Sequence, residues 1–126
     1  MSEMKEIWQQ AVYSLDKHKA LDLKALDVSG ITPIADSFVL ATGTSTTHLR
    51  SLADYVEEEL GRTGVHPLRS EGYRSGDWIT LDYGNVLLHL FRQEMREFYD
   101  LERLWSDAVP MDITPFLIES SNGEET

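Results

Sequence analysis

The sequence predicts an α/β domain in which helices pack on a mixed β-sheet of about five strands. Three features indicate this class. Apolar residues recur with helical spacing over residues 3–19 and again over 46–60. Between these helices, residues 36–42 carry few charges, which is typical of a strand covered on both faces. Farther along, Gly84 and Asn85 separate two strand-like segments, as in a two-residue hairpin turn.

The first half of the chain is expected to run helix, strand, strand, helix. The apolar stripe of the first helix comprises Met4, Ile7, Trp8, Ala11, Val12 and Leu15. A strand follows at residues 23–28, and Gly30 and Pro33 mark the loop before the buried strand. The second helix opens on hydroxyl residues at 45–47, which can accept hydrogen bonds from free N–H groups, and it ends near Gly61.

The second half is expected to form three strands and a helix. The elements are an extended segment at 67–70, a loop at 71–76, strands at 79–83 and 86–91, and a helix at 93–104. A crossover from the strand at 36–42 through the second helix would make two strands parallel, whereas the hairpin pairs antiparallel. The sheet should therefore be mixed. The inward side chains of the last helix are expected to be Met95, Phe98, Leu101 or Glu102, and Trp105.

The domain is expected to span residues 1–110. With 126 residues, the chain has room for one core and not for two. After Pro110 the periodicity is lost, so residues 111–126 are expected to form an extended arm, around 113–118, and then a disordered acidic tail from Glu119.

The composition narrows the function classes. There are 11 Lys and Arg residues against 22 Asp and Glu, so the formal net charge is -11. Nucleic-acid binding depends on basic side chains, so little direct nucleic-acid contact is expected, and a basic protein partner is favoured. The alternative is that the acidity serves only solubility. With no cysteine, no signal or transit pattern, and no apolar run near the about 20 residues of a membrane span, a cytoplasmic protein without membrane contact is expected.

The segment GTSTT at residues 43–47 lies between the buried strand and a helix N-terminus, where anions bind well. This order resembles the nucleotidyltransferase fold, so the alternative function is a nucleotide-binding or nucleotidyltransferase-type enzyme that uses the loop from Gly43 to Ser45. However, the lysine of a P-loop is missing, and Gly84 stands where a second carboxylate would pair with Asp82. The four histidines also lack metal-ligand spacing. We therefore expect no catalytic residue, no cofactor and no metal.

Trp78 has an unusual position in its strand, because alternate side chains point to opposite faces. The core face carries Ile79, Leu81 and Tyr83. Trp78 therefore shares the opposite face with Thr80 and Asp82, where it should be at least partly exposed. Either a helix covers Trp78, or it anchors a protein partner, since tryptophan is enriched among interface hot spots. In the second case its truncation would cost the fold little. His89 is expected to be a core histidine with a hydrogen-bond partner.

An ordered set of motifs resembles the ribosomal silencing factor family, also called the Iojap family. The resemblance covers roughly residues 23–108 and consists of ATGTS at 41–45, His48, Ala53-Asp54, Glu71-Gly72, Asp77-Trp78-Ile79, Leu81-Asp82, Gly84, Val86, His89 and YDLERLW at 99–105. Two departures are small: Asn85 stands where aspartate is common, and Ser106 where glycine is common.

The resemblance implies a protein without catalytic activity on a nucleotidyltransferase-like fold. It further implies binding to the large ribosomal subunit through its protein numbered fourteen, at the face that meets the small subunit. Such binding would block subunit joining and lower translation when nutrients are short. The acidic charge fits this partner, because ribosomal proteins are mostly basic. The partner-binding candidates are then Trp78, Asp77, Asp82, Glu71 and Tyr99, and a homodimer is left open.

Overall fold

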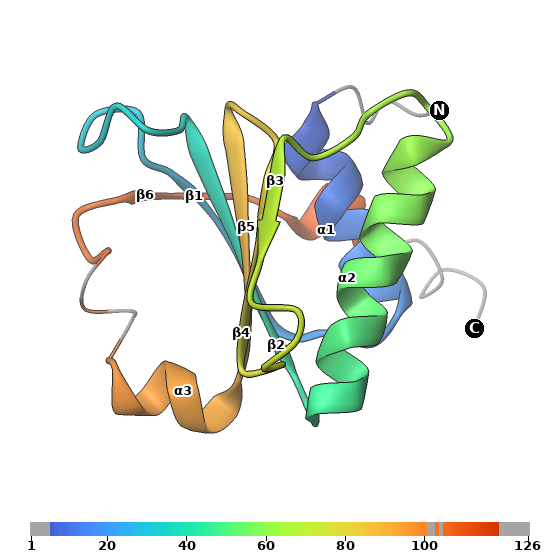
Figure 1. Cartoon of the computed structure of the whole chain (residues 1–126). Helices are drawn as coiled ribbons and strands as arrows, with labels where there is room; N and C mark the ends of the chain where they lie inside the picture. Colours follow the sequence, from blue (N-terminus) through green and yellow to red (C-terminus); the bar gives the residue numbers. More distant parts are fainter. Residues whose placement is uncertain (1–5, 101–102, 104, 119–126) are drawn as a thin grey trace, which may run out of the picture.

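A six-stranded mixed sheet forms the centre of the protein in a computed structural model that describes residues 6–100, 103 and 105–118 (Figure 1). In chain order the elements are α1 (Ile7–Lys17), β1 (Leu21–Asp27), β2 (Ser37–Gly43), α2 (Thr46–Gly61), β3 (Arg69–Glu71), β4 (Trp78–Asp82), β5 (Val86–Arg92), α3 (Gln93–Phe98), β6 (Val109–Met111) and the 3-10 helix η1 (Thr114–Phe116).

The strands lie in the order β3-β4-β5-β2-β1-β6. β2 and β5 pair in parallel, and the other neighbours in this order pair antiparallel. β2 and β3, which α2 connects, run in the same direction, but β5 and β4 lie between them. The predicted mixed α/β sheet is confirmed, with one strand more than the five expected.

Helices α1 and α2 cover one face of the sheet and enclose the larger core (Figure 1). The buried stripe of α2 consists of Leu49, Leu52, Ala53, Val56 and Leu60. At its start the Ser45 hydroxyl accepts a hydrogen bond from the backbone N–H of His48 at 3.0 Å, as predicted for a hydroxyl cap. Each residue of β2 is buried, because helices cover one face and the smaller core lies on the other.

The smaller core lies on the opposite face, on the side of α3 (Figure 1). Its buried members are Leu26, Val28, Ala35, Phe38, Leu40, Phe91 and Ala108, and Trp78, Leu87, Met95 and Trp105 pack against it half-buried. Since α3 has only 6 residues, it covers part of this face and leaves the region near Thr80 half-exposed.

The helix predicted over residues 93–104 is shorter than expected. α3 ends at Phe98, and Asp100 has a left-handed backbone with a φ of 51°. Phe98, predicted to face inward, is 78% exposed, and Arg96 is buried in its place. A helix of fewer than two turns carries too little periodicity to fix its inward face. The predicted inward positions 101 and 102 lie outside the described residues.

The predicted C-terminal arm packs back onto the domain. β6 pairs with β1 and crosses the predicted domain boundary at residue 110. Farther along, the ring of Phe116 meets that of Trp8 edge-on at 5.4 Å, and the Ile118 N–H donates to the Asp16 carboxylate at 2.8 Å. These contacts attach the arm to α1. The predicted acidic tail from residue 119 lies outside the described residues.

Candidate partner-binding surface

Trp78 is held by an aromatic cluster on the face of the sheet opposite α1 and α2. This aromatic cluster consists of Phe38, Trp78, His89, Phe91, Tyr99 and Trp105. The Trp78 ring lies 5.7 Å from Phe91 and 5.9 Å from Tyr99, centroid to centroid. Its side chain is half-buried, which confirms the expected partial exposure. Trp78 therefore packs on the smaller core and still presents part of its surface to solvent.

His89 fixes the orientation of the Trp78 indole. The indole Nε1–H donates to His89 Nδ1 at 3.2 Å, so Nδ1 is unprotonated and the proton of the neutral ring sits on Nε2. His89 is 6% exposed, and Nε2 has no hydrogen-bond partner among the described residues. Burial lowers the pKa of His89 to about 4, because the charged ring would lose its hydration. The predicted core histidine with a hydrogen-bond partner is confirmed.

Tyr99 adds an exposed aromatic side chain next to Trp78. It follows α3, is 48% exposed, and meets the ring of Phe98 edge-on at 4.9 Å. The structure thus brings Trp78 and Tyr99 together and places Phe98 beside them. Sequence reasoning missed the exposure of Phe98, because helical spacing assigned it to the core.

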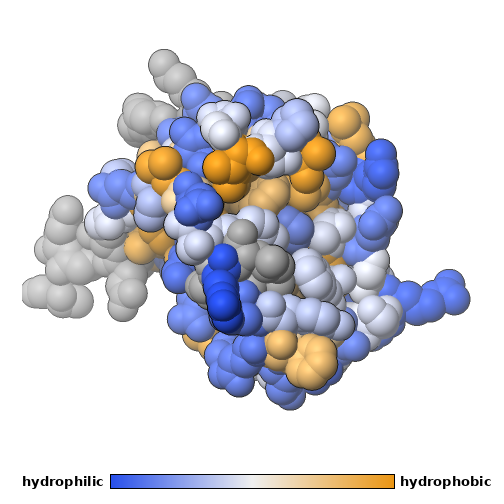
Figure 2. Space-filling model, turned by 90° about the vertical axis from the view of Figure 1, so that its left-hand side faces the viewer, coloured by the Kyte–Doolittle hydropathy of each residue, from blue (hydrophilic) through white to orange (hydrophobic). Residues whose placement is uncertain are grey.

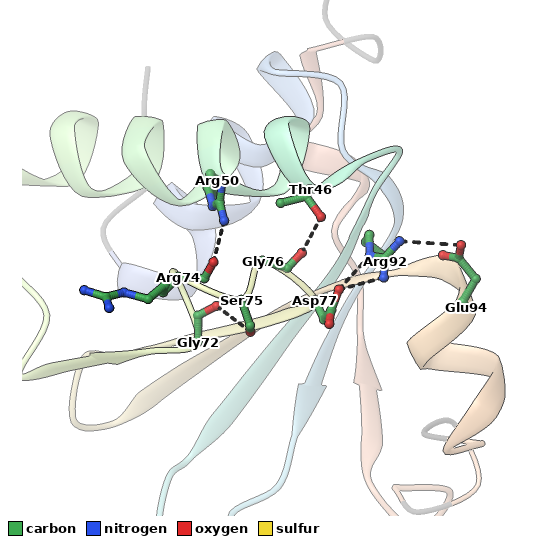
Figure 3. Close-up of polar contacts among 9 residues, drawn as sticks. All are labelled: Thr46, Arg50, Gly72, Arg74, Ser75, Gly76, Asp77, Arg92 and Glu94. Carbon is green, nitrogen blue, oxygen red and sulfur yellow. Dashed lines mark hydrogen bonds and ion pairs between the residues drawn. The ribbon is translucent and has the colours of Figure 1, made fainter.

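Asp77 lies next to Trp78 but already has an ionic partner. Its Oδ1 accepts hydrogen bonds from Arg92 Nε at 3.0 Å and Nη2 at 2.6 Å (Figure 3). The Arg92 guanidinium also lies 3.6 Å from the Glu94 carboxylate. The Asp77 side chain is 40% exposed, so it remains accessible as one end of an ion-pair chain with a net negative charge.

Asp82 and Glu71 lie farther from Trp78. Asp82 is at the other end of β4, about 13 Å along the strand from Trp78, and its Oδ1 accepts the Gly84 N–H at 2.8 Å. Glu71 on the edge strand β3 is opposite Thr80, so it shares the face of Trp78 and is exposed. Trp78, Asp82 and Glu71 therefore share one face of the sheet, and Tyr99 packs against Trp78. Asp77 precedes β4, and the register that sets Trp78 opposite Phe91 sets Asp77 opposite Arg92, so the Asp77 side chain lies toward the other face.

A shallow cavity of about 370 Å³ lies on the same side of the sheet, bordered by β1, β6 and the turn at 105–108. Its lining is mainly apolar and includes Leu26, Leu40, Ala108 and Met111. Figure 2 shows this side of the molecule, where separate hydrophobic areas alternate with hydrophilic ones. The cavity does not include the loop from Gly43 to Ser45.

The groups of the 43–45 loop are used within the fold. The Thr44 N–H donates to His48 Nδ1 at 2.9 Å, and Ser45 caps α2. His48 Nε2 in turn donates to the carbonyl of His18 at 3.0 Å, which ties the loop to the end of α1. Within the described residues there is no group of three or more histidine and carboxylate side chains placed to hold a metal ion. Nor does any described helix combine the length and apolarity of a membrane span.

Comparison with known proteins gives consistent results. The family model described as "Ribosomal silencing factor during starvation" matches residues 1–126. A ribosomal silencing factor of Chromobacterium violaceum is 35% identical over 108 residues, covering 86% of this chain and 88% of the relative. One of Bacillus subtilis is 32% identical over 109 residues, covering 86% and 92%. The mouse protein named "Mitochondrial assembly of ribosomal large subunit protein 1" is 32% identical over 95 residues, covering 73% of this chain and 42% of the mouse protein.

Solved structures agree with the sequence relatives. A crystal structure of a protein from Chromobacterium violaceum superimposes with a TM-score of 0.78 at 35% identity, covering 83% of this chain and 88% of that one. A second, from Bacillus halodurans, gives a TM-score of 0.76 at 30% identity, with 86% and 98% covered. The chain therefore belongs to the ribosomal silencing factor family.

Proposed function

We propose that this protein binds the large ribosomal subunit through the basic protein numbered fourteen. Bound there, it would occupy the face that meets the small subunit, prevent subunit joining and lower translation under nutrient limitation. Membership of the silencing factor family supports a role at the ribosome. The name of the mouse relative, which refers to assembly of the large ribosomal subunit, supports that subunit as the target.

The observation that carries the proposal is that partly exposed aromatic side chains and acidic side chains lie near one end of the sheet. Trp78 and Tyr99 offer adjacent apolar area, and Asp77, the residue before Trp78 in the chain, keeps a carboxylate that is 40% exposed. Aromatic anchors supply binding energy, and acidic neighbours select a basic partner. With 22 acidic against 11 basic residues, contact with a basic ribosomal protein is favoured over contact with ribosomal RNA.

Sedimentation with isolated large subunits tests the binding step. We expect the protein to pellet with large subunits at low salt and to be released progressively as salt screens the attraction. Small subunits serve as the control and should leave the protein in the supernatant. A protein that stays in the supernatant with large subunits even at low salt would refute the proposal.

The blocking step is tested by mixing the two subunits. Large subunits incubated with the protein beforehand should fail to form complete ribosomes in a density gradient, whereas untreated subunits should join. Unimpaired joining with the protein still bound to the large subunit would show that binding does not occlude the subunit interface.

A further inference from the structure

Helix α2 carries a polar stripe that faces the loop between β3 and β4. Thr46, Arg50 and Asp54 are spaced four residues apart, so they lie on successive turns along one side of the helix. All three contact the loop at residues 72–77, which leads directly into Trp78. Figure 3 shows the contacts of Thr46 and Arg50 with this loop. The stripe is separate from the buried face of α2 that packs on the sheet.

Arg50 is the centre of this contact. Its Nε–H donates to the carbonyl of Tyr73 at 2.9 Å, and Nη2 donates to the next carbonyl, that of Arg74. The guanidinium carbon also lies 5.8 Å from the centroid of the Tyr73 ring, within the range of a cation–π contact. A rigid guanidinium fork is suited to two neighbouring acceptors, which a lysine ammonium cannot reproduce.

Thr46 and Asp54 hold the two ends of the loop. The Thr46 hydroxyl donates to the carbonyl of Gly76 at 3.2 Å, and the Tyr73 hydroxyl donates to Asp54 Oδ2 at 3.0 Å. The bond to Asp54 also raises the pKa of the Tyr73 phenol. Three loop carbonyls and one loop hydroxyl are therefore held by side chains of a single helix face.

The loop itself makes a tight turn under these contacts. The Gly76 N–H donates to the carbonyl of Gly72 at 3.0 Å. Gly76 is buried with a φ of 69°, and a Cβ there would lie 2.3 Å from Thr46 Cγ2. The loop thus fits closely against α2, and its conformation depends on the helix as well as on its own glycines.

We propose that Arg50 is a positioning residue for the partner-binding surface. By holding the carbonyls of Tyr73 and Arg74 it fixes the loop that sets Asp77 and Trp78 in place, so that the surface is ordered before the ribosomal partner arrives. Ordering a surface in advance removes an entropic cost from binding. This role rests on the proposed function, since it concerns affinity for the large subunit.

Charge provides a sharp way to separate positioning from electrostatic attraction. Removing one arginine changes the formal net charge from -11 to -12, which by attraction alone would strengthen binding to a basic partner. Arg62, which follows the last residue of the same helix, offers a matched control, because it pairs with Glu58 at 3.0 Å where both side chains are exposed. Arg50→Ala and Arg62→Ala therefore change the charge equally, and Arg50→Ala alone releases the loop.

The experiment compares the wild-type protein with Arg50→Ala, Arg50→Lys and Arg62→Ala. Affinity for isolated large subunits is measured together with hydrogen exchange of the Gly76 amide. We expect Arg50→Ala to bind roughly tenfold more weakly and to exchange the Gly76 amide faster. Arg50→Lys should keep the charge but recover only part of the affinity. Arg62→Ala should match the wild type in exchange and bind at least as well.

Each result has a definite meaning. The positioning role is overturned if Arg50→Ala binds large subunits as well as Arg62→Ala does. It is also overturned if Arg50→Ala leaves the exchange of the Gly76 amide unchanged. If Arg50→Ala does not fold, Arg50→Lys replaces it, since lysine keeps the charge but cannot donate to both carbonyls, and binding and Gly76 exchange equal to those of the wild type would again overturn the role. If the wild-type protein does not bind large subunits, the proposed function fails instead, and the exchange data still report whether Arg50 orders the loop.

Discussion

Trp78 belongs both to the smaller core and to the candidate surface. Its indole donates to buried His89 and packs against Phe91, which itself is fully buried. These contacts add to the earlier expectation, based on partial exposure, that Trp78→Ala would leave stability near that of the wild type: some loss of stability is now expected. Truncation there removes core contacts as well as any anchor, so a binding defect in that variant alone would be ambiguous.

Tyr99 gives the cleaner test of the surface. It is 48% exposed, so Tyr99→Ala should weaken large-subunit binding by about 1 kcal/mol or more while changing the free energy of unfolding little. Trp78→Ala should weaken binding more and also lower the free energy of unfolding by about 2 kcal/mol. Tyr55→Ala, on α2 and 42% exposed, is the matched control and should bind normally. Normal binding by Tyr99→Ala would remove Tyr99 from the surface.

His89 should make stability depend on pH. Above pH about 6.5 the ring is neutral in both states, so His89 adds no pH dependence. Between about 6.5 and the folded-state pKa of about 4, the unfolded chain takes up a proton that the folded protein resists. The free energy of unfolding should therefore fall as pH falls through this range, by about 3 kcal/mol at most.

The measurement is denaturant unfolding at several pH values for the wild type and for His89→Gln. The glutamine carbonyl can still accept from the Trp78 indole, but the side chain does not titrate. The difference in the free energy of unfolding between the two proteins should grow as pH falls from 6.5 to 4. Taking this difference cancels the titration of the carboxylates that both proteins share. Parallel curves would show that His89 protonates equally in the folded and unfolded states.

At the scale of the elements, the β3–β4 loop depends on a close approach at Gly72. A Cβ at Gly72 would lie 1.9 Å from the carbonyl oxygen of Trp78, and its φ is 86°. Gly64 has nearly the same backbone, with a φ of 84°, but nothing lies within 4 Å of a Cβ there. Gly64→Ala should cost about 1 kcal/mol of stability for the left-handed backbone alone. Gly72→Ala should cost clearly more, and equal losses in chemical denaturation would show that the loop moves aside freely.

Local patterns predicted the elements whose signals extend over several residues. The stripe of α2, the buried strand β2 and the hairpin at Gly84 each carry such a pattern, and each is found close to its predicted place. β6 was missed because its 3 residues gain their structure from pairing with β1, about 85 residues earlier in the chain. The end of α3 was missed because a short helix leaves its inward face undetermined.

The part of the candidate site that lies on β4 was predictable, because strand alternation assigns each side chain to a face. Alternation placed Trp78, Thr80 and Asp82 on one face, and the register then sets His89 opposite Thr80. The contacts of Arg50 had no sequence signal, because its acceptors are backbone carbonyls, which each residue possesses. The pairing of Asp77 with Arg92 depends on a strand register that the sequence alone does not fix.

For the whole molecule, the side chains that the enzymatic alternative would use are already bonded within the fold. Ser45 caps α2, and Asp82 holds the Gly84 turn. We expect calorimetry with nucleoside triphosphates and magnesium to show no binding heat, and nucleotide assays to show no hydrolysis or transfer. Turnover that disappears in Ser45→Ala or Asp82→Asn would contradict this and establish the enzymatic alternative.

The sheet order also divides the chain into two halves that can begin to fold independently. β1 and β2 are consecutive antiparallel neighbours, as are β3, β4 and β5, so each half closes through short connections. The parallel pairing of β2 with β5, which sets Ser37 against Val86, joins the halves across 49 positions (86 minus 37), and β6 then adds to the edge of β1. Closing so long a segment is the entropically costly step, so it should limit the folding rate. Substitutions along this seam should slow folding, whereas changes in the late-joining edge strand β6 should mainly hasten unfolding.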